Sequence, residues 1–337
     1  MIRPSRDLRA VAREVEPRLP SFVRDLTRGL SGREAASHDF LSLLLFQKAL
    51  GKRRGDGGAS LPTMIASDDT RTEAPVIRTT ALTRRFGSLA AVNALNLVIP
   101  PRVIFGLLGS NGAGKTTTIR MLTTLLPPTS GTADVAGYDI VREPDRVRQH
   151  IGYVPQLLSA DGGLTGYENL LLSARLYDVS RAERKSRITE ALVFMGLETA
   201  AKTLVKNYSG GMVRRLELAQ AMLHHPVMLF LDEPTIGLDP IARRAVWERL
   251  RESRDRFAMT MLITTHDMEE ADVLCDSLAI MHAGEIAAIG TPASLKQRIG
   301  PKASLDDVFV SLAGGAIEQG GTFRDVASDR RTTTRLS

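Results

Sequence analysis

The stretch Gly109-Ser110-Asn111-Gly112-Ala113-Gly114-Lys115-Thr116 decides how the rest of the sequence is interpreted. It fits the pattern G-x-x-x-x-G-K-[ST], which forms a loop that binds phosphate. The apolar run 103–108 before it predicts a buried strand, and residues 117–125 after it predict a helix. This strand–loop–helix context suits the pattern, because backbone N–H groups and the helix N-terminus then point at the anion.

Each part of this loop has an expected role at a nucleotide. The glycines let the backbone approach the phosphates, since no Cβ intervenes. Lys115 would reach the β- and γ-phosphates, and the Thr116 hydroxyl would hold magnesium. The alternative is a glycine-rich turn that matches by accident. The predicted nucleotide-binding residues of the loop are Gly109, Ser110, Asn111, Gly112, Ala113, Gly114, Lys115, Thr116 and Thr117.

The bulk composition bounds the class of protein. The chain has 337 residues, of which 43% are hydrophobic and 24% charged, which is ordinary for a globular protein. The net charge of +6 permits contact with nucleic acid or an anionic membrane but proves neither. No apolar run approaches the ~18 residues of a membrane span. Cys275 is the single cysteine and suits a reducing compartment, so we expect a cytoplasmic protein.

The sequence divides into three parts. Residues 1–75 form an Arg-rich extension that we expect to be partly disordered, although a docking element is the alternative. A further hypothesis is that translation starts at Met64. Residues 76–300 alternate strand-like and helix-like segments, which predicts an α/β fold with a parallel sheet, and about 157–214 is mainly helical. Residues 301–337 are expected to form a short helix and a flexible tail.

Two carboxylates follow the apolar strand 227–231. A parallel strand delivers the residues at its carboxyl end to the ligand edge of the sheet. Asp232 is therefore placed to hold magnesium, and Glu233 to deprotonate a water that attacks the γ-phosphate. Two acids after a strand could instead form a helix-capping turn. The phosphate loop upstream favours the catalytic interpretation.

The segment 207–212, Asn-Tyr-Ser-Gly-Gly-Met, followed by Arg214-Arg215-Leu216, resembles the signature of ABC ATPases. The resemblance covers about 76–314. It implies a P-loop NTPase with a RecA-like parallel core, an antiparallel β subdomain, and a helical subdomain that carries the signature. It also implies that two copies pack head to tail around ATP. Ser209, Gly210 and Gly211 would then offer N–H groups and a helix dipole to the partner's γ-phosphate.

Further positions match the family one by one. Gln156 resembles the glutamine that touches magnesium, and Asp239 lies in a loop that resembles the one crossing the dimer interface. His266 resembles the switch histidine that contacts the γ-phosphate. Phe86 stands where the family has an aromatic residue that stacks on adenine, and it keeps the π-face of the commoner Tyr. The departures are small: Tyr208, Met212 and Ser110 replace the usual residues without removing a phosphate donor.

Met212, the strand-end segment 229–240 and the segment 304–309 are similar to exporters of the daunorubicin-resistance and nodulation-factor type. The resemblance implies an ATP- and Mg²⁺-dependent ATPase subunit of an exporter. Its partners would be a separate multi-span permease and a second copy of the chain, at the cytoplasmic face of the membrane, with no nucleic acid. The alternatives are an ABC ATPase that acts on ribosomes or DNA, a regulatory ATP switch, and an importer.

Overall fold

The computed structural model describes residues 74–317, with side chains through residue 312. The described chain divides into two compact units. We call residues 75–142, 230–233 and 251–317 the sheet unit, and residues 143–229 and 234–250 the helical unit. The extension predicted at 1–75 and the tail after 317 lie outside the described residues, except for the last two residues of the extension.

The first sheet of the sheet unit is antiparallel throughout, in the order β2-β1-β4-β5. Alternate residues near the end of β2, Leu95, Leu97 and Ile99, are buried, so one face of this sheet packs on the core. The bounds are β1 (Ile77–Phe86), β2 (Leu89–Ile99), β4 (Ser130–Val135) and β5 (Tyr138–Asp139).

The second sheet carries the order β10-β9-β3-β8, with β7 beside β8. Strand β3 is parallel to both β8 and β9, while β9 and β10 form an antiparallel hairpin. Every residue of β3 and β8 is buried, as expected for parallel strands covered on both faces. The parallel register brings the carboxyl ends of β3 and β8 to one edge. The bounds are β3 (Ile104–Leu108), β7 (Met228–Asp232), β8 (Thr260–Thr265), β9 (Ser277–His282) and β10 (Glu285–Gly290).

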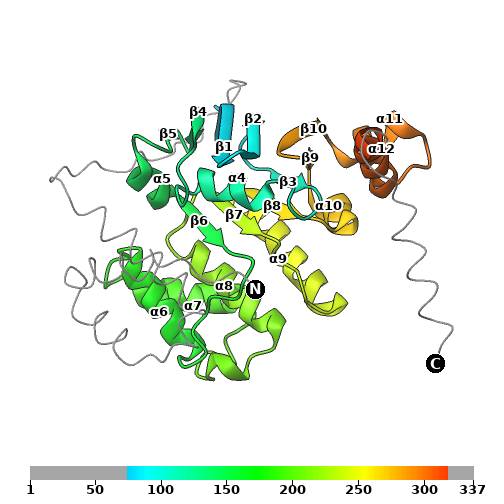
Figure 1. Cartoon of the computed structure of the whole chain (residues 1–337). Helices are drawn as coiled ribbons and strands as arrows, with labels where there is room; N and C mark the ends of the chain where they lie inside the picture. The colour runs from blue at the N-terminus through cyan, green and yellow to red at the C-terminus, as the bar shows by residue number, and fades with distance from the viewer. Residues whose placement is uncertain (1–73, 318–337) are drawn as a thin grey trace, which may run out of the picture. The chain divides into compact units, whose positions relative to one another are not determined.

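Four helices complete the sheet unit: α4 (Lys115–Leu122), α10 (Met268–Leu274), α11 (Pro292–Ile299) and α12 (Leu305–Ile317). Helices α11 and α12 lie side by side after the β9–β10 hairpin (Figure 1). Leu305 and Val308 of α12 join a buried cluster with Leu108 of β3 and Leu278 of β9. The C-terminal helix is therefore part of the core of this unit.

The helical unit begins with α5 (Pro144–His150) and strand β6 (Ile151–Val154), which lies beside β7. Helices α6, α7 and α8 pack on one another through buried residues such as Leu170, Ile188 and Leu216. Thr165 and Glu168 form a reciprocal capping box that fixes the start of α6. The remaining bounds are α6 (Gly166–Leu176), α7 (Arg184–Phe194), η3 (Val205–Asn207), α8 (Gly210–Met222) and α9 (Pro240–Phe257), whose last turns lie in the sheet unit.

The element boundaries differ from the predicted ones where backbone geometry intervenes. Helix α4 starts at Lys115 rather than 117, because Gly114 adopts a left-handed conformation with φ of 104° and ends the loop there. It ends at Leu122 rather than 125, where Thr124 has a φ of 63°. Helix α12 is the short helix expected within 301–337, and it continues to Ile317.

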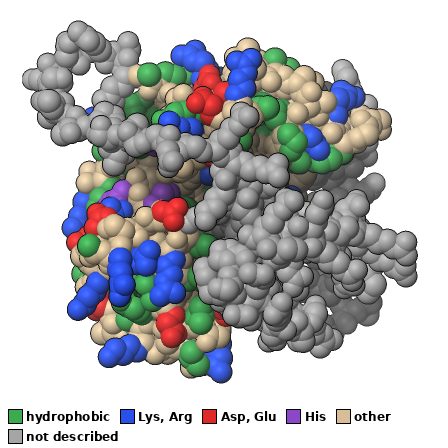
Figure 2. Space-filling view, turned by 90° about the vertical axis from the view of Figure 1, so that its left-hand side faces the viewer, with side chains coloured by type: hydrophobic (Ala, Val, Ile, Leu, Met, Phe, Trp, Pro, Cys, Tyr) green, Lys and Arg blue, Asp and Glu red, His purple; other side chains and the backbone are tan. Residues whose placement is uncertain are grey.

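Among the described residues, no helix is long and apolar enough to cross a membrane. On the face in Figure 2, Lys and Arg side chains are interspersed with Asp and Glu side chains. The positive net charge is therefore not gathered into a single uninterrupted basic surface on that face.

Candidate active site

The loop between β3 and α4 has the geometry of a backbone cradle. Gly112 and Gly114 both have positive φ, and the N–H of Ala113 donates to the carbonyl of Ser110. A Cβ at Gly114 would lie 2.4 Å from the carbonyl oxygen of Ala91. Gly114 is therefore required both by its conformation and by this close approach. The loop delivers its N–H groups and the start of α4 to the edge at which β3 ends.

Lys115 is held inside this loop. Its Nζ donates to the carbonyl oxygens of Gly109 at 2.8 Å and Ser110 at 3.1 Å, and the residue is only 5% exposed. Burial lowers the pKa of Lys115, and the nearby charges of Glu233 and Asp232 oppose that shift. The ammonium group is thus a desolvated cation whose two carbonyl contacts a phosphate could replace.

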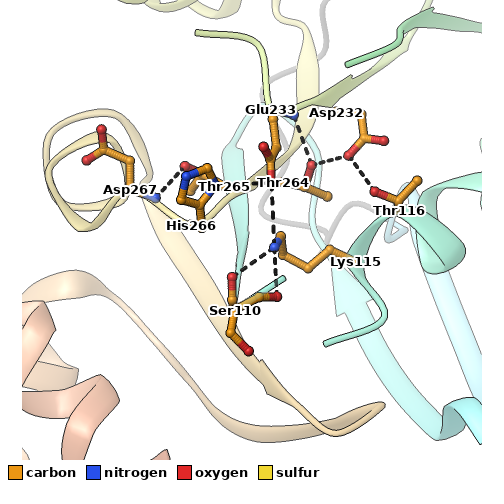
Figure 3. Close-up of polar contacts among 10 residues, drawn as sticks. Ser110, Lys115, Thr116, Asp232, Glu233, Thr264, Thr265, His266 and Asp267 are labelled. Carbon is orange, nitrogen blue, oxygen red and sulfur yellow. Dashed lines mark hydrogen bonds and ion pairs between the residues drawn. The ribbon is translucent and has the colours of Figure 1, made fainter. Parts of the chain in front are cut away.

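Glu233 lies between two other functional groups at the end of β7. Its Oε1 is 3.7 Å from Lys115 Nζ and 3.1 Å from Nδ1 of His266 (Figure 3). His266 follows β8 directly and is about half exposed, while Glu233 is buried. The edge therefore brings a buried carboxylate together with one cation and one imidazole, all delivered by the ends of neighbouring strands and by the loop.

Asp232 is surrounded by hydroxyl groups. Thr116 Oγ1 donates to Asp232 Oδ1 at 3.1 Å, and Thr264 Oγ1 donates to the same oxygen at 2.5 Å (Figure 3). An alcohol and a carboxylate beside a phosphate loop match the hard oxygen ligands that Mg²⁺ prefers. The described residues contain no group of three or more His, Cys, Asp or Glu side chains that could hold a metal by itself. This donor set fits a metal that keeps phosphate and water ligands.

Phe86 ends β1 and is 47% exposed. The guanidinium carbon of Arg84 lies 4.7 Å from the centre of the Phe86 ring, within the range of a cation–π contact. Nη1 of Arg84 also donates to the carbonyl of Pro127. One face of the ring is therefore backed by a cation that is itself held in place.

The other predicted site residues belong to the helical unit. Ser209 caps α8, because its hydroxyl accepts the N–H of Met212. Asp239 accepts the N–H groups of residues 241 and 242 at the start of α9. The carbonyl of Gln156 accepts a bond from Nη2 of Arg214 at 2.9 Å. The structure thus brings together Lys115, Thr116, Asp232, Glu233 and His266 in one unit, whereas Gln156, Ser209, Gly210, Gly211 and Asp239 lie in the other.

Comparisons with known proteins agree with this geometry. The ABC transporter family profile matches residues 92–236. The daunorubicin/doxorubicin resistance ATP-binding protein DrrA of Streptomyces peucetius is 46% identical, over 66% of this chain and 68% of that protein. The chain belongs to the ABC transporter ATP-binding family. This ABC ATPase is also 43% identical to the Nod factor export ATP-binding protein I of Paraburkholderia xenovorans (strain LB400), over 63% of this chain and 69% of that protein.

A solved ATP-binding subunit of an ABC transporter has the same fold. It aligns with a TM-score of 0.64 and 30% identity, covering 71% of this chain and 99% of that one. The predicted α/β P-loop fold and the resemblance to the daunorubicin-resistance and Nod-factor subgroup are confirmed. As a member, the chain is an ATP-binding ATPase subunit, and a transporter subunit implies a partner in the membrane.

Sequence reasoning missed two contributions to the site of this ABC ATPase. One is Thr264, a fully buried hydroxyl that bonds Asp232 and the backbone of Glu233. The other is the role of Glu217 on α8, which pairs with Arg214 of the signature segment and binds the backbone after β6. For Thr264 the available signal was a hydroxyl residue near the carboxyl end of a buried strand.

Proposed function

We propose that this ABC ATPase hydrolyses Mg²⁺-bound ATP as a head-to-tail homodimer and thereby drives export through a separate membrane permease. The observation that carries the proposal is the shared carboxylate: Oε1 of Glu233 lies within 3.7 Å of Lys115 Nζ and 3.1 Å of His266 Nδ1, beside the phosphate loop. A carboxylate base and a phosphate-binding cation are groups that serve γ-phosphate hydrolysis, and the imidazole can add a contact to the phosphate or the attacking water.

Nucleotide binding is assigned to the loop and to Phe86. The N–H groups of residues 109–117 and the N-terminus of α4 would surround the phosphates, and Lys115 would exchange its carbonyl contacts for the β- and γ-phosphates. The exposed ring of Phe86 would stack on adenine through the face that Arg84 does not cover. The loop and Lys115 would thus recognise the charge of the phosphates, and the ring of Phe86 would contact adenine through dispersion forces.

Magnesium is assigned to Thr116 and Asp232, and a contact from Gln156 is what the family resemblance implies. When bound, the ion would neutralise charge on the β- and γ-phosphate oxygens. The hydroxyl of Thr116, which already bonds Asp232, is the protein group best suited to face it. Asp232 is 1% exposed and accepts bonds from two hydroxyl groups, which orient its carboxylate in the absence of a ligand.

Hydrolysis is assigned to Glu233. Its carboxylate would accept a proton from the attacking water, and His266 would orient that water and contact the γ-phosphate. Lys115 Nζ lies 3.7 Å from the same carboxylate, so a phosphate that binds the ammonium group would lie close to the assigned base.

The second half of each nucleotide site is assigned to a second copy. Ser209 caps α8, so Gly210 and Gly211 at the start of that helix present N–H groups and a positive dipole end to an anion. Asp239, which caps the start of α9, would cross the interface. The phosphate loop of each copy would face the signature segment of the other copy, so the same contact occurs twice around a twofold axis. Both nucleotide sites would therefore form at the same time.

Export is supported by the relatives, whose names record daunorubicin/doxorubicin resistance and Nod factor export. By analogy, the cargo would be a drug-like, lipid or glycan molecule, and the chain would work at the cytoplasmic face of the membrane. Nucleic acid is not an expected partner of a chain in this role.

The substitution Glu233→Gln tests the assigned base. We expect ATP hydrolysis to fall about 10²–10⁴-fold while binding of ATP is retained, since only the proton acceptor is lost. The matched control is Glu190→Gln, at an exposed position of α7. Full turnover in the Glu233→Gln variant would refute the assignment of the base.

A further inference from the structure

Strand β8 carries a polar side chain where burial is complete. Thr264 is 0% exposed, and all six residues of its strand are buried. A buried hydroxyl is costly unless it is hydrogen-bonded, and a Val of the same shape would fill this position without that requirement. We therefore expect the buried hydroxyl of Thr264 to form hydrogen bonds with specific groups.

Thr264 bonds two consecutive residues of the neighbouring strand end. Its Oγ1 donates to Oδ1 of Asp232 at 2.5 Å and accepts the backbone N–H of Glu233 at 3.0 Å (Figure 3). The directions are fixed, because an ionised carboxylate only accepts and an N–H only donates. One hydroxyl thus links the side chain of Asp232 to the backbone of Glu233.

The backbone at Glu233 needs such support. Its φ is 50°, a left-handed conformation that is uncommon for a residue other than glycine. Strain of this kind persists only where the surroundings hold it. The N–H of Glu233 donates both to the carbonyl oxygen of Thr264, at 3.1 Å, and to its hydroxyl. The left-handed turn is what aims the side chain of Glu233 at Lys115 and His266 rather than along the strand.

We propose that Thr264 is a positioning residue that sets the magnesium carboxylate Asp232 and the general base Glu233 in fixed mutual register. This inference rests on the proposed function of those two residues. Thr116 bonds the same Asp232 oxygen from the loop side, so a chain of contacts runs Thr116–Asp232–Thr264–Glu233. A change in how Asp232 is held is thereby transmitted to the backbone that carries the base.

The test compares Thr264→Val, which keeps the shape and removes the hydroxyl, with Thr264→Ser, which keeps the hydroxyl. We expect Thr264→Val to lower kcat about 10- to 100-fold with KM changed less than about threefold, since the bonds position a base rather than a substrate. Thr264→Ser should restore kcat to within about threefold of the wild type. In the nucleotide-free protein, hydrogen exchange of the Glu233 amide should accelerate in Thr264→Val but not in Thr264→Ser.

Thr260 provides the matched control. It lies in the same strand, is 1% exposed, and accepts the N–H of Arg102 at 2.9 Å at the far end of β8. Thr260→Val removes an equally buried hydroxyl, so it should lower the melting temperature as Thr264→Val does while leaving kcat unchanged. If Thr264→Val does not fold, the pair Thr264→Ala and Thr260→Ala replaces it, because both lose the hydroxyl and the γ-methyl group at equally buried positions.

The outcomes separate the inference from the function on which it rests. Loss of turnover in both Glu233→Gln and Thr264→Val, with rescue by Thr264→Ser, supports the positioning role. If Glu233→Gln is inactive but Thr264→Val turns over normally, or the Glu233 amide exchanges as in the wild type, the positioning role is refuted and the proposed function stands. If Glu233→Gln is fully active, the assigned base is wrong and the positioning role is refuted with it.

Discussion

The buried ion pair on α8 gives the sharpest stability prediction. Arg214 and Glu217 are 1% and 2% exposed, with Arg214 Nη1 lying 3.0 Å from Glu217 Oε2. Arg214 also donates to the carbonyl oxygens of Pro155 at 2.8 Å and Gln156 at 2.9 Å. Glu217 Oε1 accepts bonds from the Ser159 hydroxyl and from the N–H groups of residues 159 and 160. The pair therefore holds the backbone of residues 155–160 against α8, the helix that begins within the signature segment 207–212.

Replacing Arg214 with Met leaves Glu217 buried without its cation and removes the Arg214 bonds to two carbonyl groups. Breaking a buried pair in this way typically costs about 3–5 kcal/mol in all. We expect the free energy of unfolding to fall by about 3–5 kcal/mol near neutral pH. Burial raises the pKa of Glu217 and Arg214 opposes it, so without Arg214 the carboxyl takes up a proton more readily. The deficit should therefore shrink as the pH falls.

The assay is urea denaturation of wild type, Arg214→Met and a surface control. The control is Arg187→Met, whose partner Glu183 lies 2.8 Å away in a pair with side chains 25% and 50% exposed. That pair should contribute less than about 1 kcal/mol to the free energy of unfolding. The double variant Arg214→Met/Glu217→Leu should lose less than the sum of the two single losses, because no buried charge is left uncompensated. Equal small losses for Arg214→Met and Arg187→Met would refute the reasoning.

Two further predictions concern His224 and Phe86. His224 stacks on Tyr177 with ring centroids 3.8 Å apart, and its burial lowers its pKa from 6.5 to about 4 although the Ile151 carbonyl opposes the shift. Between pH 6.5 and about 4, His224 is protonated in the unfolded chain but not in the folded protein. When the pH falls from 7 to 4, the free energy of unfolding should therefore fall by up to about 3 kcal/mol more for wild type than for His224→Phe. Urea denaturation at each pH measures this difference. Parallel pH curves for the two proteins would contradict this. Phe86→Ala should weaken ATP binding by about 1–3 kcal/mol and Phe86→Tyr should not, because base stacking is lost only in the former. Calorimetry should show that neither variant changes the affinity for tripolyphosphate, which has no base to stack. If Phe86→Ala weakened tripolyphosphate binding as much as ATP binding, stacking would be excluded as the cause.

The parts of the site that lie close together in sequence could be predicted from it. The glycine pattern around Lys115 is local, and its flanks alternate between strand and helix as the phosphate loop requires. The carboxylates at 232–233 follow an apolar run, so a parallel sheet carries them to the ligand edge without any knowledge of contacts. The meeting of Lys115, Glu233 and His266 follows from the same rule, because Glu233 and His266 directly follow strand ends and Lys115 closes the phosphate loop after β3.

The parts that depend on contacts between distant segments could not be predicted. The bond from Thr264 to Asp232 joins residues 32 positions apart and depends on the pairing of β7 with β8. The positive φ of Glu233 has no sequence signal, since glutamate rarely adopts it. The packing of helix α12 also depends on distant segments, because Leu305 and Val308 join a buried cluster with Leu108 of β3 and Leu278 of β9.

Complementation between two inactive variants tests most directly whether two copies share each site. In a head-to-tail dimer of Lys115→Ala and Ser209→Arg chains, one site carries both lesions and the other carries neither. Each variant alone should be inactive, and an equal mixture should regain about a quarter of wild-type ATPase activity, since about half of the dimers are mixed and each has one intact site. A mixture that stays inactive, or a Ser209→Arg protein that hydrolyses ATP normally without a partner, would contradict the shared site.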